Sequence, residues 1–133
     1  MATPAAKQND QIVAVDTHIV MVPSPTGPVP TPLPHPFNGI IDGNLSSNVY
    51  IMGLPAATAD STATNQPPHI PTPPGTSFQT PPNNKGTIMV GSKSVYINNK
   101  MAARAGDQAR TCADPIPNMT AKVVASGTVL IGG

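Results

Sequence analysis

Residues 49–57 read VYIMGLPAA, and residues 95–103 read VYINNKMAA. The second stretch begins 46 positions after the first, and Val, Tyr, Ile, Ala and Ala recur in register. A repeat at a fixed spacing indicates that one structural unit is used more than once. The alternation of Val, Tyr and Ile has the period of two that is typical of a half-buried strand. We therefore expect an all-β fold built from repeated units.

Each copy is preceded by a second apolar stretch, and turn-forming residues lie between the two. These residues, at 42–44 and 91–93, are typical of tight turns in β-hairpins. The sequence thus predicts units of strand, turn, strand and small-residue segment. The units cover about residues 39–69 and 86–112, and the C-terminal SGTVLIGG belongs to a partial third unit over residues 121–133.

The second copy continues as AARAGD. We align Asp107 with Asp60 of the first copy, which makes Gly106 an inserted residue. Gly106 is expected to adopt a positive φ in a turn, and Arg104 to pair with Asp107 at the surface. Strand alternation marks a set of core candidates: Val49, Ile51, Val95 and Ile97.

The composition favours a folded domain with a small core. The chain has 133 residues, the length of one domain spanning residues 1–133, with 18 Pro, 11 Gly and no Trp. Disordered chains usually carry a high net charge, whereas here the net charge is +1 and charged residues make up 10%. Small cores commonly need a disulfide, a metal or a partner. The single cysteine excludes an internal disulfide, and without a basic stripe we expect no nucleic-acid partner.

Proline is concentrated in residues 23–36 and 67–82. Because proline cannot donate to a strand ladder, we expect both segments to be extended surface loops. Flexible linkers or docking segments for SH3-type domains are the alternative. Residues 11–22 read as one long strand, and helical periodicity is weak throughout the sequence.

The N-terminal residues MATPAAKQND lack the apolar segment of a signal peptide. The sequence also lacks an apolar run of the ~18 residues that a membrane-spanning helix requires. We therefore expect synthesis in the cytoplasm and export by another route.

Residues 55–58, Pro-Ala-Ala-Thr, and residues 101–104, Met-Ala-Ala-Arg, resemble two copies of the Pro-Ala-Ala-Arg motif of the PAAR family. The stretch PSPTGPVPTPLPHP resembles PAAR-like proteins that occur with contractile tails and effector proteins. The resemblance extends from about residue 16 to residue 133. It implies a small conical β-fold with pseudo-threefold repeats and long proline-rich loops.

The resemblance also implies a function and partners. PAAR proteins form the tip of contractile injection systems, which include type VI secretion systems, phage tails and extracellular injection particles. The broad base caps a trimeric spike, either VgrG-like or of the phage type, with one tip per trimer. Such a tip is expected to cross the target membrane transiently when the sheath contracts, and effector cargo is a further partner that it could recruit.

The resemblance finally implies a metal ion held by three histidines and one cysteine at the narrow end. The chain has one such set, namely His18, His35, His69 and Cys112. Imidazole and thiolate ligands suit one structural Zn²⁺ in a closed tetrahedral site, and Fe²⁺ is also compatible. His69 and Cys112 both follow the small-residue segment of their repeat, which we interpret as equivalent positions. The spacing alone leaves open that these side chains are unrelated.

The sequence contains few features that are typical of an enzyme. It contains no Glu, its six Asp are scattered, and the common nucleophile and phosphate-binding motifs are missing. We therefore expect a non-enzymatic protein. Two alternatives remain: Cys112 as a thiol nucleophile beside a histidine, and a zinc-stabilised adaptor or interaction protein with proline-rich docking segments outside any injection machine.

Overall fold

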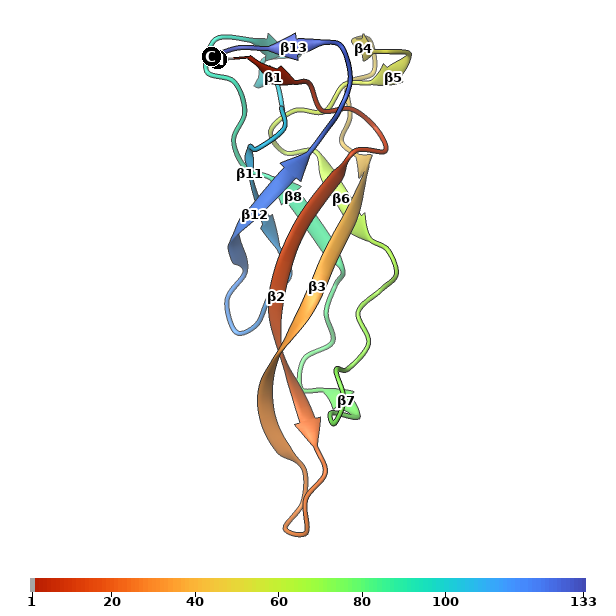
Figure 1. Ribbon diagram of the computed structural model, residues 1–133, viewed down its shortest axis with the longest axis vertical. Helices are drawn as coiled ribbons and strands as arrows, with labels where there is room; N and C mark the ends of the chain where they lie inside the picture. The colour runs from red at the N-terminus through yellow and green to blue at the C-terminus, as the bar shows by residue number, and fades with distance from the viewer. Residues whose placement is uncertain (1) are drawn as a thin grey trace.

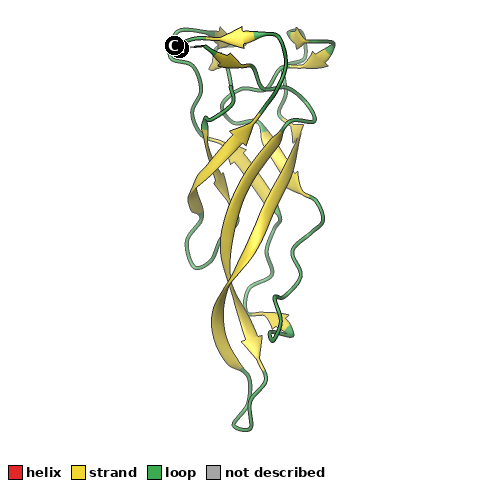
Figure 2. Cartoon of the chain, in the orientation of Figure 1, coloured by secondary structure: helices red, strands yellow, loops and turns green. Residues whose placement is uncertain are grey.

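The computed structural model describes residues 2–133 and has the shape of an elongated cone (Figure 1). Both chain ends lie at the wide end, which we call the base, and a long hairpin forms the opposite, narrow tip. All regular structure within residues 2–133 is strand, so the all-β prediction is confirmed (Figure 2). Helices long and apolar enough to cross a membrane are accordingly absent from this range.

Six antiparallel strands close into a small barrel in the middle of the cone. In barrel order they are β2 (Gln11–Val22), β3 (Val29–Gly43), β6 (Thr62–Asn65), β8 (Lys85–Ile88), β11 (Gln108–Thr111) and β12 (Asn118–Val124). β12 pairs back with β2, so the barrel leaves no free edge in this region. The short β7 (Ser77–Phe78) pairs with β2 nearer the tip.

The barrel interior is filled by small aliphatic side chains and one phenylalanine. The fully or almost fully buried members are Ala6, Ile12, Phe37, Ile41, Ala57, Ala63, Ile88, Ala103, Ala109, Ala121 and Val123. Ala63, Ala109 and Ala121 lie on barrel strands, and their small side chains let the strands approach a common axis closely. The core is therefore narrow, as the composition predicted.

Three pairs of two-residue strands form the base. Two are hairpins, in which β4 (Tyr50–Ile51) pairs with β5 (Leu54–Pro55) and β9 (Tyr96–Ile97) pairs with β10 (Lys100–Met101). In the third, β13 (Leu130–Ile131) pairs with β1 (Thr3–Pro4). The first two belong to the repeats seen in the sequence. The third joins the two ends of the chain, so the partial unit at residues 121–133 is completed by the N-terminal residues. Residues 4–7, Pro-Ala-Ala-Lys, are thus a third copy that the sequence analysis missed.

A closed ring of backbone hydrogen bonds joins the three copies. The amide of Ala6 donates to the carbonyl of Ala103 (2.9 Å), Ala103 to Ala57 (3.1 Å), and Ala57 to Ala6 (3.0 Å). Each of these residues is the second alanine of its copy. Because the same bond recurs between each copy and the next, the three units are related by an approximate threefold rotation.

This symmetry corrects the alignment of the repeats. Asn9, Asp60 and Gly106 all have a positive φ, at 75°, 77° and 87°, and they occupy the same position in the three units. The positive φ predicted for Gly106 is confirmed, but Gly106 is not an insertion. Asp107 therefore matches Ser61, and the alignment of Asp60 with Asp107 was wrong.

The predicted pair of Arg104 and Asp107 is present, with 3.0 Å between Nη2 and Oδ1. It is less exposed than expected, because the side chain of Asp107 is only 7% exposed. Arg104 also donates to the carbonyl of Gly132, which ties the second unit to the C-terminal end.

The core predictions were half right. Ile51 and Ile97 are buried, whereas Val49 and Val95 are 36% and 37% exposed. The base hairpins have two-residue strands, so the valines lie just before them and not within a longer alternating ladder.

The hairpins predicted across residues 42–44 and 91–93 do not form. β3 pairs with β2 and β6, and β8 pairs with β6 and β11, whereas β4 and β9 pair within the base. The residues between β3 and β4 carry the chain from the barrel into the base. The two stretches of each repeat therefore lie in different sheets.

The prediction of a loop over residues 23–36 was also wrong in part, because β3 begins at Val29. Prolines at alternate positions of β3, from Pro30 to Pro36, all place the missing amide on one edge. That edge faces away from β2, and β6 pairs with β3 only from Gly39 onward. The ladder therefore loses no donor to these prolines. Residues 67–82 form a loop apart from β7, as predicted.

Replacement of a base isoleucine tests the equivalence of the three units. Ile131→Ala, in the unit made from both chain ends, is expected to cost about 2–4 kcal/mol of unfolding free energy because Ile131 is 7% exposed. Ile51→Ala and Ile97→Ala should cost similar amounts. The adjacent Leu130 is 57% exposed, and Leu130→Ala should change stability by less than about 0.5 kcal/mol. Denaturant unfolding measures all four, and a neutral Ile131→Ala would contradict the third unit.

Candidate metal centre

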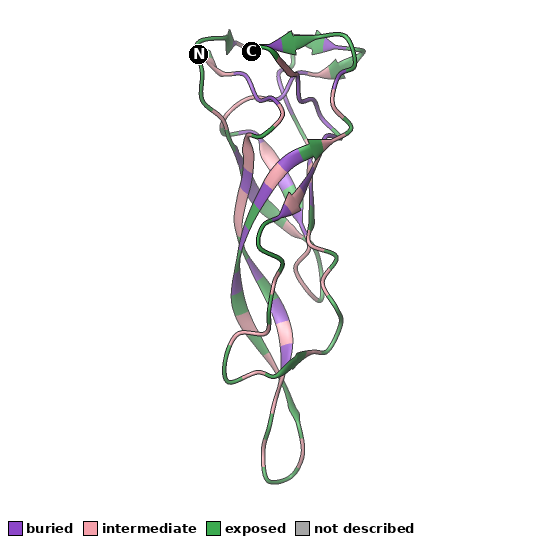
Figure 3. Cartoon of the chain, turned by 90° about the vertical axis from the view of Figure 1, so that its right-hand side faces the viewer, coloured by how far each residue is buried: buried purple, intermediate pink, exposed green. Residues whose placement is uncertain are grey.

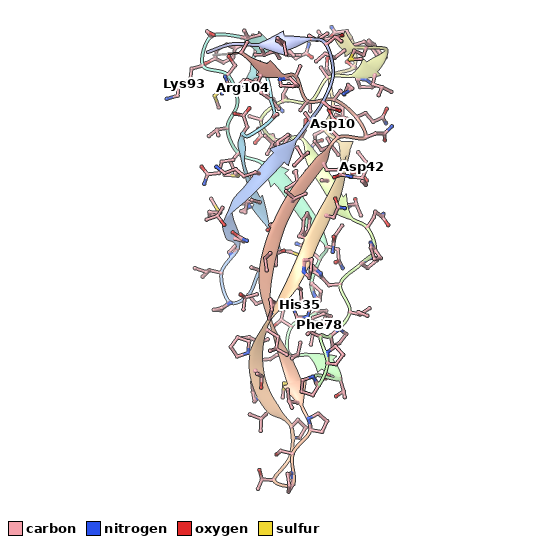
Figure 4. The ribbon with its side chains drawn as sticks, in the orientation of Figure 1. Asp10, His35, Asp42, Phe78, Lys93 and Arg104 are labelled. Carbon is pink, nitrogen blue, oxygen red and sulfur yellow. The ribbon has the colours of Figure 1, made fainter. Side chains whose placement is uncertain are left out.

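Buried polar side chains gather below the barrel core, towards the tip. Asp16 and His18 lie two residues apart on β2 and therefore on the same face of that strand. His35 pairs with Asp16 across the β2–β3 ladder. His69 lies in the loop after β6, and Cys112 directly follows β11. Figure 4 shows His35 in this narrower part of the cone, close to Phe78.

Four of these residues bring potential ligand atoms together. Asp16, His18, His69 and Cys112, which we call the metal-site cluster, each offer one atom within 4.8 Å of the others. The Cys112 Sγ lies 3.7 Å from both Asp16 Oδ2 and His18 Nε2. Asp16 and His18 are completely buried. The cluster thus combines two imidazoles, a thiol and a carboxylate in one enclosed place.

His18 is oriented by a carboxylate. Its Nδ1–H donates to Asp114 Oδ2 over 2.9 Å, which leaves the lone pair of Nε2 directed at the cluster. A histidine that binds a metal through one nitrogen usually donates its other N–H to a carboxylate or carbonyl. His18 therefore has the arrangement of a metal ligand.

His69 carries an unsatisfied buried atom. Among residues 2–133 its Nε2 finds no hydrogen-bond partner, and it lies 3.6 Å from Asp16 Oδ2, too far for a hydrogen bond. The other ring nitrogen, Nδ1, lies 3.2 Å from the Asn65 amide nitrogen. A metal on Nε2 requires the ring proton on Nδ1. Asn65 would then have to turn its amide oxygen towards His69, although this oxygen accepts a hydrogen bond from the Asn38 backbone amide at 2.8 Å. The free Nε2 is the clearest sign of a missing partner in the cluster.

His35 lies beside the cluster but uses both nitrogens elsewhere. Its ring centroid is 5.3 Å from that of His18 and 5.5 Å from that of His69. Nδ1–H donates to the carbonyl of Leu33 (2.9 Å), and Nε2 accepts from the amide of Thr72 (3.1 Å). Burial lowers the pKa of His35, which favours this neutral form. Its place as a ligand stays a prediction.

Asp16 was not among the predicted site residues. Burial raises the pKa of its carboxyl, but contacts with His69, Thr111 and Asn118 together lower it below the ordinary value. Asp16 is therefore a carboxylate at neutral pH. The period of two in β2 was the available signal, because it places Asp16 on the face that carries His18.

The structure also revises the reasoning about equivalent positions. His18 and His69 each lie seven residues after the first residue of their strand, β2 or β6. Cys112 lies only four residues after the start of β11. His69 is thus the counterpart of His18 and not of Cys112.

Residues 79–133 match the profile of the PAAR motif, which covers the second repeat and the C-terminal strand of the base. This match supports membership of the PAAR family. Neither a curated protein nor a solved structure showed significant similarity to the chain. The resemblance found in the sequence is thereby confirmed, and the PAAR motif implies a role at the spike tip of a contractile injection system. PAAR proteins are structural spike components and not enzymes.

PAAR proteins bind a metal ion, and the cluster fits one. Nitrogen, sulfur and carboxylate oxygen are all zinc ligands. The unsatisfied His69 Nε2 and the His18 Nε2 held in place by Asp114 both face the same space. A bound ion would join β2 to the segments that follow β6 and β11.

Alkylation of Cys112 separates a structural thiol from an activated one. Burial, and next the charge of Asp16, raises the pKa of Cys112 to about 11 in the metal-free protein. The thiolate is the reactive form, so alkylation by iodoacetamide should be slow at pH 7 and rise about tenfold per pH unit up to pH 10. The same reaction in denaturant should level off near the ordinary cysteine pKa. Rapid labelling of the folded protein at pH 7 would support a catalytic nucleophile instead.

Proposed function

We propose that this PAAR protein is the metal-stabilised tip that caps the trimeric spike of a contractile injection apparatus and helps to pierce the target envelope. The observation that carries the proposal is the threefold base. Three strand pairs, related by the ring of alanine hydrogen bonds, present three similar surfaces from one chain. One such chain matches three identical spike chains.

The base exposes apolar side chains at equivalent positions of its three units. Val49, Val95 and Val129 are 36–40% exposed, and at the next position Tyr50, Tyr96 and Leu130 are 57–59% exposed. Exposed apolar side chains grouped on one face mark interaction sites. We expect this surface, the apolar ring, to contact the end of a VgrG-like or phage-type spike.

The opposite end suits penetration. The β2–β3 hairpin narrows to a turn, and the residues around this turn are exposed or half-buried (Figure 3). Proline at alternate positions of β3 limits backbone freedom in this hairpin. The stiffness of the narrow end therefore comes from the ladder and the prolines, since little core lies below the cluster.

The metal has a structural role in this proposal. His18, His69 and Cys112 lie on three different segments, so one ion would fix the narrow part of the cone. Zn²⁺ suits these ligands best, and Fe²⁺ is the alternative. A fourth ligand from the protein leaves no position for a catalytic water.

We further propose that the protein acts outside the cell that makes it, at the tip of a secreted or extracellular particle. It contacts the target membrane transiently, and effector cargo would join it non-covalently.

Co-expression with the trimeric spike protein of the same injection machine tests the partner. We expect the two proteins to co-purify through affinity and size-exclusion steps. A folded, metal-loaded protein that never associates with the spike would favour the alternative of a zinc-stabilised adaptor.

A further inference from the structure

We propose that the end of the β2–β3 hairpin has an affinity of its own for lipid and enters the acyl-chain region of a neutral bilayer at equilibrium. We call residues 19–33 the tip hairpin. The inference goes beyond a tip that is only pushed through a membrane, and it rests on the proposed function only in that the narrow end meets the membrane first.

The tip hairpin lies in a part of the molecule without charged side chains. Residues 17–41 and 61–84, which include the hairpin, β7 and the loop that carries β7, contain no Asp, Glu, Lys or Arg. In Figure 4 the labelled charged residues Asp10, Asp42, Lys93 and Arg104 lie in the wide half of the cone. Because Asp, Lys and Arg are the side chains that most strongly oppose entry into hydrocarbon, their absence removes the main barrier to insertion.

The side chains of the tip hairpin are mainly apolar. Residues 19–33 contain five prolines and the apolar residues Ile19, Val20, Met21, Val22, Val29 and Leu33. Val29 is 45% exposed. The hydroxyl groups of Ser24 and Thr31 donate to the backbone carbonyls of Gly27 and Val29, respectively. These hydroxyl protons therefore have partners inside the hairpin and do not depend on water.

Backbone donors are missing or paired along both edges of the tip hairpin. On the β3 edge, Pro30 and Pro32 face away from β2 and have no amide proton to leave unpaired. On the β2 edge, β7 pairs with β2, and the amide of Thr76 donates to the carbonyl of Met21 at 3.0 Å. Unpaired backbone donors are costly in hydrocarbon, which normally keeps strand edges out of it. Both edges of this hairpin are therefore suited to lipid.

The length of the tip hairpin fits one leaflet. The strand from Ile19 and the turn at residues 23–28 extend about 20 Å at ~3.3 Å per residue, and half of the hydrocarbon core is about 15 Å thick. The barrel and the metal-site cluster would then remain outside the acyl chains. Because the hairpin is uncharged, a neutral phospholipid is the expected partner, and binding should not depend on salt.

A single tryptophan reports insertion directly, because the chain has none of its own. Val29→Trp labels the tip hairpin and Tyr50→Trp labels the base. With phosphatidylcholine vesicles at 1 M NaCl, where the Debye length is ~3 Å, we expect a blue shift for Val29→Trp and about twofold or greater quenching by lipids brominated on the acyl chains. Tyr50→Trp should show neither. An unquenched Val29→Trp, quenching of Tyr50→Trp alone, or dimerisation through the tip without lipid binding would overturn the inference.

Two matched variants test the lack of charge. Val29 and Val124 are 45% and 48% exposed, and Val124 lies on β12 of the barrel, away from the tip hairpin. Val29→Asp should weaken partition into phosphatidylcholine vesicles at least about 10-fold in co-sedimentation, whereas Val124→Asp should bind like the wild type. Equal losses, or no loss, would contradict the proposal.

Spike binding by the same proteins separates this inference from the proposed function. Both variants should co-purify with the spike as the wild type does. A wild-type protein that caps the spike but does not bind vesicles would overturn the lipid inference alone. A protein that inserts into vesicles but never binds the spike would overturn the proposed cap alone.

Discussion

Removal of the metal with a chelator is expected to lower the melting temperature by roughly 15 °C. Metal binding should contribute ~4 kcal/mol to the free energy of unfolding, and the chelator removes this contribution. The barrel core consists mainly of alanine and few large side chains, so it contributes little stability of its own. A bound ion would add a strong link between β2 and the segments after β6 and β11, beside hydrogen bonds such as that from His18 to Asp114. Scanning calorimetry of the loaded and stripped protein measures the difference.

The matched control is the double variant His18→Gln and Cys112→Ser, which retains similar side-chain volumes but removes two ligands. This variant should have the same melting temperature as the metal-free wild-type protein. Neither zinc nor chelator should shift that temperature. A stripped wild-type protein as stable as the loaded one would contradict a structural role for the ion.

Introduction of charge into the apolar ring is expected to abolish spike binding. The triple variant Tyr50→Asp, Tyr96→Asp and Leu130→Asp places one carboxylate in each unit of the base, at side chains 57–59% exposed. Three buried, unpaired charges at an interface should weaken binding by at least about 1,000-fold, or ~4 kcal/mol. Biolayer interferometry against the immobilised spike measures the loss.

A control variant outside the base keeps this test specific. Ile70 is 75% exposed and lies in the loop after β6, far along the chain from the base hairpins. Ile70→Asp should bind the spike like the wild type. Full binding by the triple variant would place the partner elsewhere on the molecule.

The sequence predicted the fold class and the resemblance to the PAAR family, and it contains two visible copies of the repeat. These signals are local, because VYI and the paired alanines recur at a fixed spacing. The third copy was missed because its strand and its Pro-Ala-Ala-Lys segment lie at opposite ends of the chain. Only the pairing of β13 with β1 brings them together.

The errors in β3 and in the predicted hairpins have one physical source. Whether a proline disrupts a ladder depends on which edge its missing amide faces, and whether two stretches pair depends on the closed barrel. Neither property can be read from composition or turn residues. The alternate spacing of Pro30 to Pro36 was the one local signal that β3 could accommodate proline.

The candidate site was predicted in part. His18, His69 and Cys112 meet in the structure, and His35 lies beside them. Cysteine and histidine attract notice in a sequence because they are rare here, whereas Asp16 resembles any other aspartate. Its significance follows from complete burial beside an unsatisfied His69 nitrogen, which only the fold reveals.

The mass of the complex with the spike, measured by native mass spectrometry, tests the proposed function most directly. A tip with three equivalent base units should give one chain of this protein, with one metal ion, for each spike trimer. A complex with three copies per trimer, or a spike trimer without this chain, would contradict the role of a single cap.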